Sequence, residues 1–142
     1  AGDGKLYFIP FSTEAALIVD PTTGISDQAS ISSPGVSAMT GSNKWSGGVL
    51  STNGKVYGIP AESDVVLVID PTTTSATTIG SLGTGQLKWQ GGALAPNGWI
   101  YGVPYKSTSL LAIDPVAGTV DTSTAVAGAS SEDQWYGGVL RT

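Results

Sequence analysis

The sequence contains no cysteine and no histidine. Without cysteine there is no disulfide framework, thiol nucleophile, iron–sulfur site or thiolate zinc site. Without histidine the Ser-His-Asp and Cys-His catalytic groups and most zinc hydrolase sites are excluded. We therefore expect no metal site, no cofactor and no catalytic residue, and we predict that the protein is not an enzyme.

Charge and long apolar runs are also scarce. Only 12% of the residues are charged, and six basic against eleven acidic residues give a net charge of −5. This is the wrong sign for a surface that binds phosphates, so we expect no nucleic-acid partner. No apolar run approaches the roughly 20 residues of a membrane span, and the N-terminus lacks the charged-then-apolar pattern of a secretion signal. We expect a soluble chain without a membrane partner, and the sequence indicates no cellular location.

What the sequence does contain is an internal repeat. A motif ending in proline occurs three times, as GKLYFIP at 4–10, GKVYGIP at 54–60 and GWIYGVP at 98–104. Each copy is followed ten residues later by an Asp-Pro pair, and a Trp-x-Gly-Gly-[Val/Ala]-Leu segment begins at Trp45, Trp89 and Trp135. Aligned without a gap, 45–71 and 89–115 are identical at 14 of 27 positions, far more than chance produces.

The repeat predicts the fold. The 142 residues divide into units of about 47, at approximately 1–50, 51–94 and 95–142, a length typical of four-stranded propeller blades. Asn-Gly pairs at 53–54 and 97–98 favour tight hairpins. The run 65–69 is apolar at every position, so it must be covered on both faces, as a strand in a blade packed between two others is. We predict an all-β fold of three four-stranded antiparallel blades.

Three recurring features have a structural interpretation. The double glycine reflects either crowding near the propeller axis or a local β-bulge, and the sequence leaves both open. The recurring tryptophans and tyrosines are expected to pack blade against blade rather than to stack on sugars. Each recurring aspartate precedes proline and is expected to cap a turn rather than to act in catalysis; these residues are Asp20, Asp70 and Asp114.

The two ends of the chain predict how the blades assemble. Residues 1–4 match a turn that should follow a first strand, and residues 135–140 match a first strand whose turn is missing. Rings of this kind use roughly four to eight blades. We expect closure by strand exchange in a homodimer of six blades, with a nine-blade homotrimer or a fragment of a longer chain as alternatives. The closing residues are predicted to be Leu6, Tyr7, Ile9, Trp135, Gly137, Gly138, Val139 and Leu140.

Two phrases in the second unit support a comparison with a known family. NGKVYGIP at 53–60 and VLVIDPTT at 66–73 resemble the repeats of bacterial propellers of the Tyr-Val-Thr-Asn and quinoprotein-like type. The resemblance extends over all three units and implies the propeller fold, but it implies no activity. The sequence departs from that family at Trp-x-Gly-Gly and at the Ile-Pro that ends the motif.

Two functions follow from this pattern. The first is a self-assembling propeller scaffold, natural or engineered, without a catalytic role. The second is a multivalent, lectin-like module that binds carbohydrate through aromatics that break the repeat. An interpretation as scattered surface aromatics stays open for these candidate ligand residues, which are Trp99, Tyr105, Lys106 and Tyr136.

Overall fold

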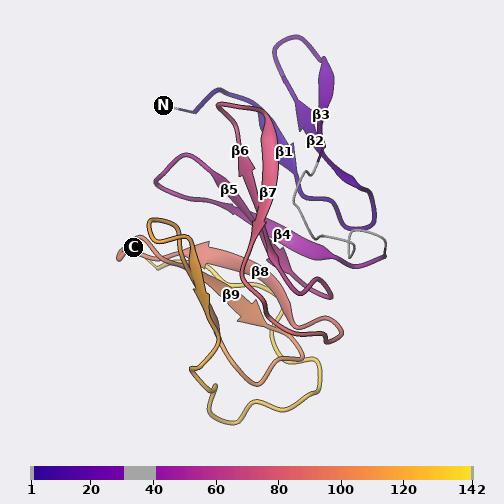
Figure 1. The fold of residues 1–142 in the computed structure, drawn as a ribbon. Coiled ribbons are helices and arrows are strands. Elements are labelled where there is room, and N and C mark those ends of the chain that lie inside the picture. The colour runs from indigo at the N-terminus through magenta and orange to yellow at the C-terminus, as the bar shows by residue number, and fades with distance from the viewer. Residues whose placement is uncertain (1, 31–40, 142) are drawn as a thin grey trace.

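The computed structural model describes residues 2–30 and 41–141. Every regular element in this part of the chain is a β-strand, and the strands form three antiparallel sheets. The all-β prediction is confirmed. We call the sheets blades 1, 2 and 3 in chain order (Figure 1).

Blade 1 contains three strands, β1 (Leu6–Phe8), β2 (Ala15–Val19) and β3 (Ser26–Ser30). Blade 2 contains β4 (Trp45–Leu50), β5 (Val56–Pro60), β6 (Val66–Asp70) and β7 (Ser75–Ile79). Blade 3 contains β8 (Trp89–Leu94), β9 (Ile100–Pro104), β10 (Leu111–Asp114) and β11 (Thr119–Asp121). Within each blade, each strand pairs with the next along the chain, as in a meander.

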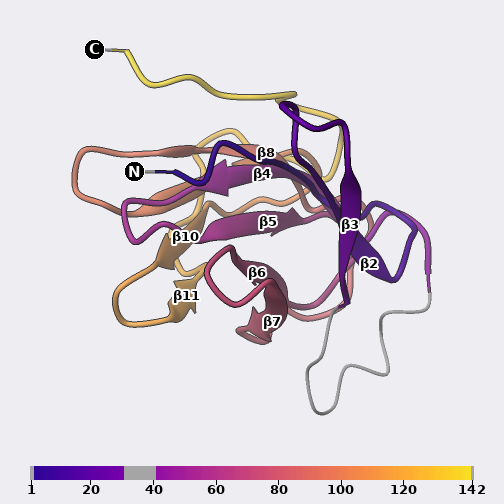
Figure 2. The same ribbon diagram turned by 90° about the horizontal axis from the view of Figure 1, so that it is seen from above.

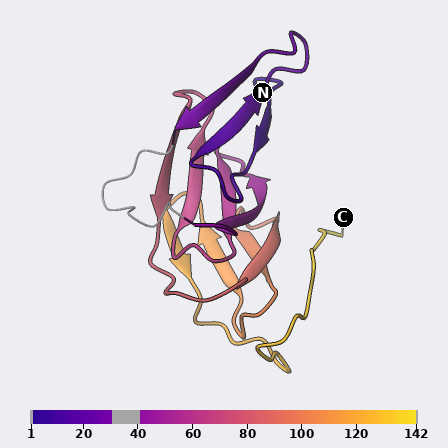
Figure 3. The ribbon, with the colours of Figure 1, turned by 90° about the vertical axis from the view of Figure 1, so that its right-hand side faces the viewer.

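The predicted four-stranded unit is confirmed in blades 2 and 3, but blade 1 has only three strands. No described segment pairs with the free edge of β1. The segment 135–140, predicted as a first strand, has no strand pairing with any of residues 2–30 and 41–141. Figure 3 shows this yellow C-terminal segment running apart from the three sheets. Ring closure between chains stays a prediction.

The blades stack side by side, with β4 and β8 neighbouring each other at one edge of the stack (Figure 2). The strand β6 lies between blades 1 and 3, so its successive side chains enter two different cores. Val66 and Val68 join the cluster between blades 2 and 3, whereas Leu67 and Ile69 join the cluster between blades 1 and 2. The expectation of a strand covered on both faces is confirmed.

Both explanations of the double glycines hold, a β-bulge at the first glycine and crowding at the second. Gly47 and Gly91 have φ of 81° and 66° and lie where the register shifts between the tryptophan and the second glycine, which is a β-bulge. The second glycines lie in crowded places. A Cβ on Gly48 would stand 2.6 Å from Ile9 Cγ1. A Cβ on Gly92 would stand 2.8 Å from the carbonyl oxygen of Tyr101.

The recurring aspartates cap turns, as predicted. In the first two units the Oδ1 atom accepts a hydrogen bond from the backbone N–H two residues later, at 2.8 Å from Asp20 to Thr22 and 2.9 Å from Asp70 to Thr72. Asp114 accepts two backbone N–H groups in the same way. In each case the Oδ1 atom accepts its hydrogen bonds within its own turn, and Asp70 Oδ2 additionally lies 3.1 Å from Lys55 Nζ.

Candidate functional site

One residue in each unit connects two blades through its backbone. The Lys44 N–H donates to the Phe11 carbonyl of blade 1 at 2.8 Å, and the Lys88 N–H donates to the Ala61 carbonyl of blade 2 at 2.8 Å. The Lys44 carbonyl accepts a hydrogen bond from the Ala61 N–H of blade 2 at 2.9 Å. The Lys88 carbonyl accepts one from the Tyr105 N–H of blade 3, also at 2.9 Å. The residue before each inner-strand tryptophan is therefore a backbone link across a blade junction.

The tryptophan that follows this link anchors the inner strand within its own blade. Trp45 Nε1 donates to the Val65 carbonyl at 2.8 Å, and Trp89 Nε1 donates to the Ser109 carbonyl at 2.9 Å. The two side chains are 1% and 2% exposed. Trp45 belongs to the cluster between blades 1 and 2 and Trp89 to the cluster between blades 2 and 3. The predicted packing of blade against blade is confirmed for these two residues.

The linking lysines are buried, which is unusual for this residue type. Lys44 and Lys88 lie with Nζ 6.0 and 5.9 Å from the ring centres of the adjacent tryptophans. Lys88 Nζ also donates to the Ser63 carbonyl at 2.9 Å. Burial lowers the pKa of both ammonium groups because it disfavours the charged form. Backbone oxygens and the ring face compensate part of this desolvation.

The C-terminal segment repeats the first half of this arrangement. The Gln134 N–H donates to the Tyr105 carbonyl at 3.0 Å, as the two lysines do to the blade before them. A Cβ on Gly138 would stand 3.1 Å from Val103 Cγ2, matching the contact of Gly92 with Ile59. Residues 134–138 therefore contact blade 3 in the way that an inner strand contacts the preceding blade.

In the described part of the chain, the C-terminal segment lacks the contacts that β4 and β8 make within their own blades. Trp135 is 43% exposed and Val139 is 92% exposed, and Leu140 and the glycines Gly137 and Gly138 are exposed as well. The Oε1 atom of Gln134 is buried and has no hydrogen-bond partner within the described residues. These side chains lack the blade of their own that β4 and β8 have.

Blade 1 has the complementary gap, because no described inner strand pairs with the free edge of β1. Leu6 and Phe8 are each 50% exposed. Tyr7 and Ile9 instead pack against the cluster between blades 1 and 2, where Ile9 approaches Gly48. The side chains of Tyr7 and Ile9 therefore stabilise the junction with blade 2, whereas the side chain of Leu6 and the backbone edge of β1 are open to a partner.

A cavity of about 780 Å³ lies beside this free edge, between blades 1 and 2. One wall is formed by residues 2–7, and the other by parts of blade 2. Within it the Tyr7 hydroxyl donates to Asp3 Oδ2 at 2.6 Å. Burial, together with this hydrogen bond, raises the pKa of Tyr7 to about 12. The same hydrogen bond lowers the pKa of Asp3.

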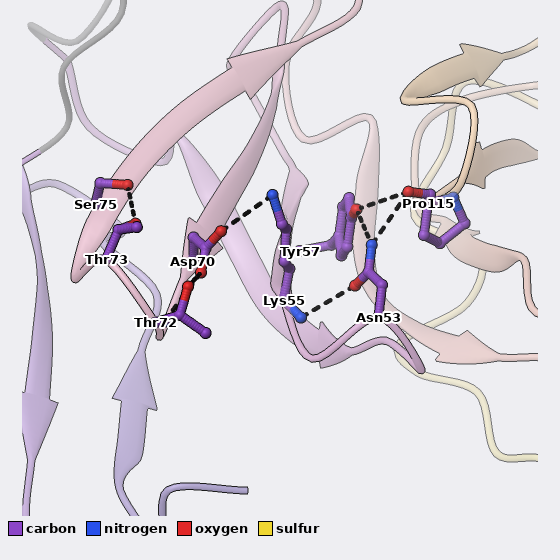
Figure 4. A network of polar contacts seen from close by, with 8 residues as sticks. All are labelled: Asn53, Lys55, Tyr57, Asp70, Thr72, Thr73, Ser75 and Pro115. Atoms are coloured by element: carbon purple, nitrogen blue, oxygen red, sulfur yellow. Dashed lines mark hydrogen bonds and ion pairs between the residues drawn. The ribbon is translucent and has the colours of Figure 1, made fainter. Parts of the chain in front are cut away.

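The junction between blades 2 and 3 is closed by a polar clamp at the corresponding place (Figure 4). Asn53 Nδ2 donates to the Pro115 carbonyl at 3.1 Å and to the Tyr57 hydroxyl at 3.0 Å. The equivalent of Asn53 in blade 1 is Asp3, and a carboxylate has no N–H to donate. This clamp was not predicted, although the change from asparagine to aspartate in the first unit is visible in the sequence.

Three of the four candidate ligand residues lie together. The rings of Tyr105 and Tyr136 contact edge to face, with centres 5.8 Å apart at 82°. Lys106 Nζ lies 3.4 Å from Asp133 Oδ1, a residue that was not among the predicted ligand residues. A hydrogen bond to Asp133 raises the pKa of Tyr105.

Trp99 lies apart from that group. It precedes β9 whereas Tyr105 follows it, and a strand of this length separates its two flanks by roughly 20 Å. The four residues therefore do not form one site. Among residues 2–30 and 41–141 there is no group of three or more acidic side chains able to hold a metal ion. The same part of the chain contains no helix long and apolar enough to cross a membrane.

Comparison with known proteins gives structural neighbours only. No protein-family model and no curated protein matches the sequence. Among solved structures, virginiamycin B lyase from Staphylococcus aureus matches 91% of this chain and 40% of its own, with 12% identity and a TM-score of 0.69. Hydrazine synthase from Kuenenia stuttgartiensis matches 89% and 34%, with 17% identity and a TM-score of 0.64. An auxiliary nutrient binding protein from Bacteroides ovatus matches 91% and 29%, with 17% identity and a TM-score of 0.61.

These neighbours support the predicted propeller-type fold and correct the prediction that the protein is not an enzyme. The prediction that the protein is not an enzyme is wrong as an inference, because the neighbours include a lyase and a synthase on the same type of fold. The physical reason is that lacking histidine and cysteine removes particular catalytic groups, whereas Asp, Glu, Lys and Tyr remain able to transfer protons. The chain spans about 40% of the lyase, and at these identities the likeness concerns the fold alone, which is propeller-type.

Proposed function

We propose that the protein is a self-assembling propeller-type chain in which residues 134–140 of one copy complete blade 1 of a second copy. The observation that carries this proposal is the pair of contacts that Gln134 and Gly138 make with blade 3. Those contacts are the ones that β4 and β8 make with the blade before them. The segment has the position of an inner strand and lacks only the blade that such a strand completes.

The repeat fixes the expected register of the new pairing. In blade 2 the tryptophan opposes the proline and the leucine opposes the first residue of β5, as Trp45 does Pro60 and Leu50 does Val56. Blade 3 has the same register. The corresponding pairs across two copies are Trp135 with Pro10, Gly138 with Phe8, Val139 with Tyr7 and Leu140 with Leu6.

The pairing would also satisfy groups that the single chain leaves without partners. Trp135 Nε1 would donate to the Ala15 carbonyl, as Trp45 does to Val65. Burying Leu6 and Val139, whose equivalents Val56 and Val49 are each 8% exposed in blade 2, would contribute roughly 1.5–3 kcal/mol for each side chain. The unpaired edge of β1, which is an aggregation hazard, would be covered.

A homodimer fits the blade number better than a homotrimer. Two copies give six blades, within the usual range of about four to eight, whereas three copies give nine. A two-fold arrangement also makes both junctions equivalent, since each copy gives one segment and receives one.

The test is the mass in solution of the full chain and of two variants, each of which replaces an equally exposed valine by aspartate. We expect light scattering to give twice the chain mass of 14.3 kDa. Val139→Asp should yield monomers, because a charge would enter the new blade. Val116→Asp should leave the dimer intact, since Val116 is also 92% exposed but lies in a turn far from the junction. A monomeric full chain at high concentration would overturn the proposal.

A second function, carbohydrate binding, is favoured by the group of Tyr105, Tyr136, Lys106 and Asp133. Aromatic faces beside charged and hydroxyl groups are what a sugar site uses, and two copies would add avidity. A glycan array tests this directly. Binding that is lost in Tyr136→Ala and kept in Trp99→Ala would support the site, whereas an array without binding would exclude it.

A further inference from the structure

Two residues depart from the repeat with opposite charges, and both belong to the same predicted hairpin turn. The residue that follows the inner strand is Ser51 in blade 2 and Ala95 in blade 3, but Arg141 in the C-terminal segment. Arg141 is the only arginine of the chain. The turn residue two positions further on is asparagine in blades 2 and 3, but Asp3 in blade 1.

The turn has the same geometry wherever it is complete. In blade 2 the Ser51 N–H donates to the Lys55 carbonyl at 2.9 Å, and the Lys55 N–H donates to Asn53 Oδ1 at 3.0 Å. In blade 3 the Ala95 N–H donates to the Trp99 carbonyl at 2.8 Å. The two positions are two residues apart, so their Cα atoms lie within about 7 Å, a span that an arginine side chain bridges.

Blade 1 contains half of this turn. The Lys5 N–H donates to Asp3 Oδ1 at 3.1 Å, as its equivalent does in blade 2. Given the proposed register, which this inference assumes, the residue opposite Lys5 is Arg141 of the second copy. Its guanidinium would then lie beside the Asp3 carboxylate.

The surroundings of Asp3 can receive such a group. The cavity of about 780 Å³ is lined by Asp3, Tyr7 and Thr72, while Arg141 is exposed and forms no ion pair within the described residues. Position 51 is only 4% exposed in blade 2. A cation at that depth requires a carboxylate partner. Each oxygen of Asp3 accepts one hydrogen bond in the chain, and a carboxylate has about four acceptor sites.

We propose that Arg141 of one copy forms an ion pair with Asp3 of the other copy, and that this pair selects the partner strand. Blades 2 and 3 have no charge at either position, so their inner strands offer no arginine to this cavity. The Lys5 ammonium is the nearby like charge, and it lies on the exposed side of the turn. Opposite charges at an interface act mainly through specificity and register.

Charge exchange between two variants tests the pair. Alone, Arg141→Asp and Asp3→Arg should each raise the dimer dissociation constant by about tenfold or more, because like charges then meet at both junctions. Mixed in equal amounts, the two variants should form a heterodimer of full-chain affinity, since each junction then joins opposite charges. Native mass spectrometry separates the heterodimer from either homodimer.

The control is Asp121→Arg, which makes the same charge change at an exposed position of β11 and should leave the dimer unaffected. If the full chain is a monomer, the proposed assembly itself fails. If the full chain forms the dimer while the two charge reversals do not weaken it, only the ion pair is wrong. Weakened single variants that do not recover on mixing would also overturn the ion pair.

Discussion

The two blade junctions of this chain are built from the same repeat, but only the junction between blades 2 and 3 is fully packed. Between blades 2 and 3, large side chains such as Ile59, Leu111 and Ile113 fill the core, and Asn53 closes one end. Between blades 1 and 2, Ala16 and Ala76 are part of the core, and a cavity remains at the corresponding end. The comparison teaches that an inner strand stabilises two blades, its own and the neighbouring one.

The largest expected effect is steric and separates the glycines of the two inner strands. Gly92→Ala should destabilise the protein by about 2–3 kcal/mol, because the new methyl group would meet the Tyr101 carbonyl oxygen of the paired strand β9, which cannot move aside. Gly48→Ala should cost only about 1 kcal/mol, because its close neighbour is the side chain of Ile9 at the more open junction. Urea unfolding measures both. Equal costs would mean that the Ile9 side chain at the open junction adapts no better than a paired backbone oxygen.

The second prediction concerns the anchoring tryptophans. Trp89→Phe should cost about 1–3 kcal/mol, since the Ser109 carbonyl loses the indole donor and keeps only the Ser107 hydroxyl, and since the smaller ring leaves space in a buried place. Trp135→Phe should leave the unfolding midpoint of the monomer unchanged, because that side chain is exposed. Denaturation at a protein concentration too low for assembly checks the pair. A large effect of Trp135→Phe under those conditions would contradict the comparison.

The third prediction concerns the polar clamp. Asn53→Asp should destabilise the protein by about 1–2 kcal/mol, because it removes the donor to the Pro115 carbonyl and sets a charge against that oxygen. Asp3→Asn should change the monomer little, since no carbonyl of blade 2 contacts Asp3 in the chain. Thermal unfolding of both variants measures the difference, and an equal loss would refute a clamp specific to blades 2 and 3.

The smallest effect expected is on pH dependence. A hydrogen bond from the Thr72 hydroxyl, followed by the contact with Lys55 at 3.1 Å, lowers the pKa of Asp70 to about 2. Because the folded pKa lies below the ordinary value of 3.8, this group stabilises the protein above about pH 4. That contribution is lost as the pH falls from about 4 to about 2.

The measurement for this prediction is an NMR titration of the Asp70 carboxyl in the full chain and in Lys55→Met. The variant should titrate at a higher pH, since the contact with Lys55 is lost. The turn of Asp20 is the internal control, because its pKa is lowered chiefly by Thr22. An unchanged titration of Asp70 would show that Lys55 contributes nothing there.

Several features of the fold were predictable because they depend on local chemistry. The alternation of β6 between two cores follows from an unbroken apolar run, and the three aspartate turns follow from Asp-Pro. The last strand was the least predictable. The Thr-rich stretch 120–126 favours a full strand, but β11 ends at Asp121, where the side chain accepts the Ser123 N–H. Pairing resumes beyond this interruption, where 124–126 bonds to 108–110 through the backbone.

The candidate site was predicted only in part. The repeat predicts an inner strand at 135–140, which stays a prediction, and the side chains of Tyr7 and Ile9 pack at the junction with blade 2. Repeat-breaking aromatics were grouped by type, although Trp99 lies at the opposite end of β9 from Tyr105. The link through Lys44 and Lys88 was missed because a backbone hydrogen bond leaves no mark on residue type.

The sequence by itself determined the all-β class, the Asp-Pro turns and most of the strands in blades 2 and 3, because these depend on periodicity and on neighbours a few residues apart. The tertiary structure alone decided which residues meet across a junction. Asn53 and Pro115 are 62 positions apart, and no local pattern encodes their contact. The tertiary structure likewise decided that Gln134 and Gly138 rest on blade 3, because that contact depends on where the preceding blade has folded.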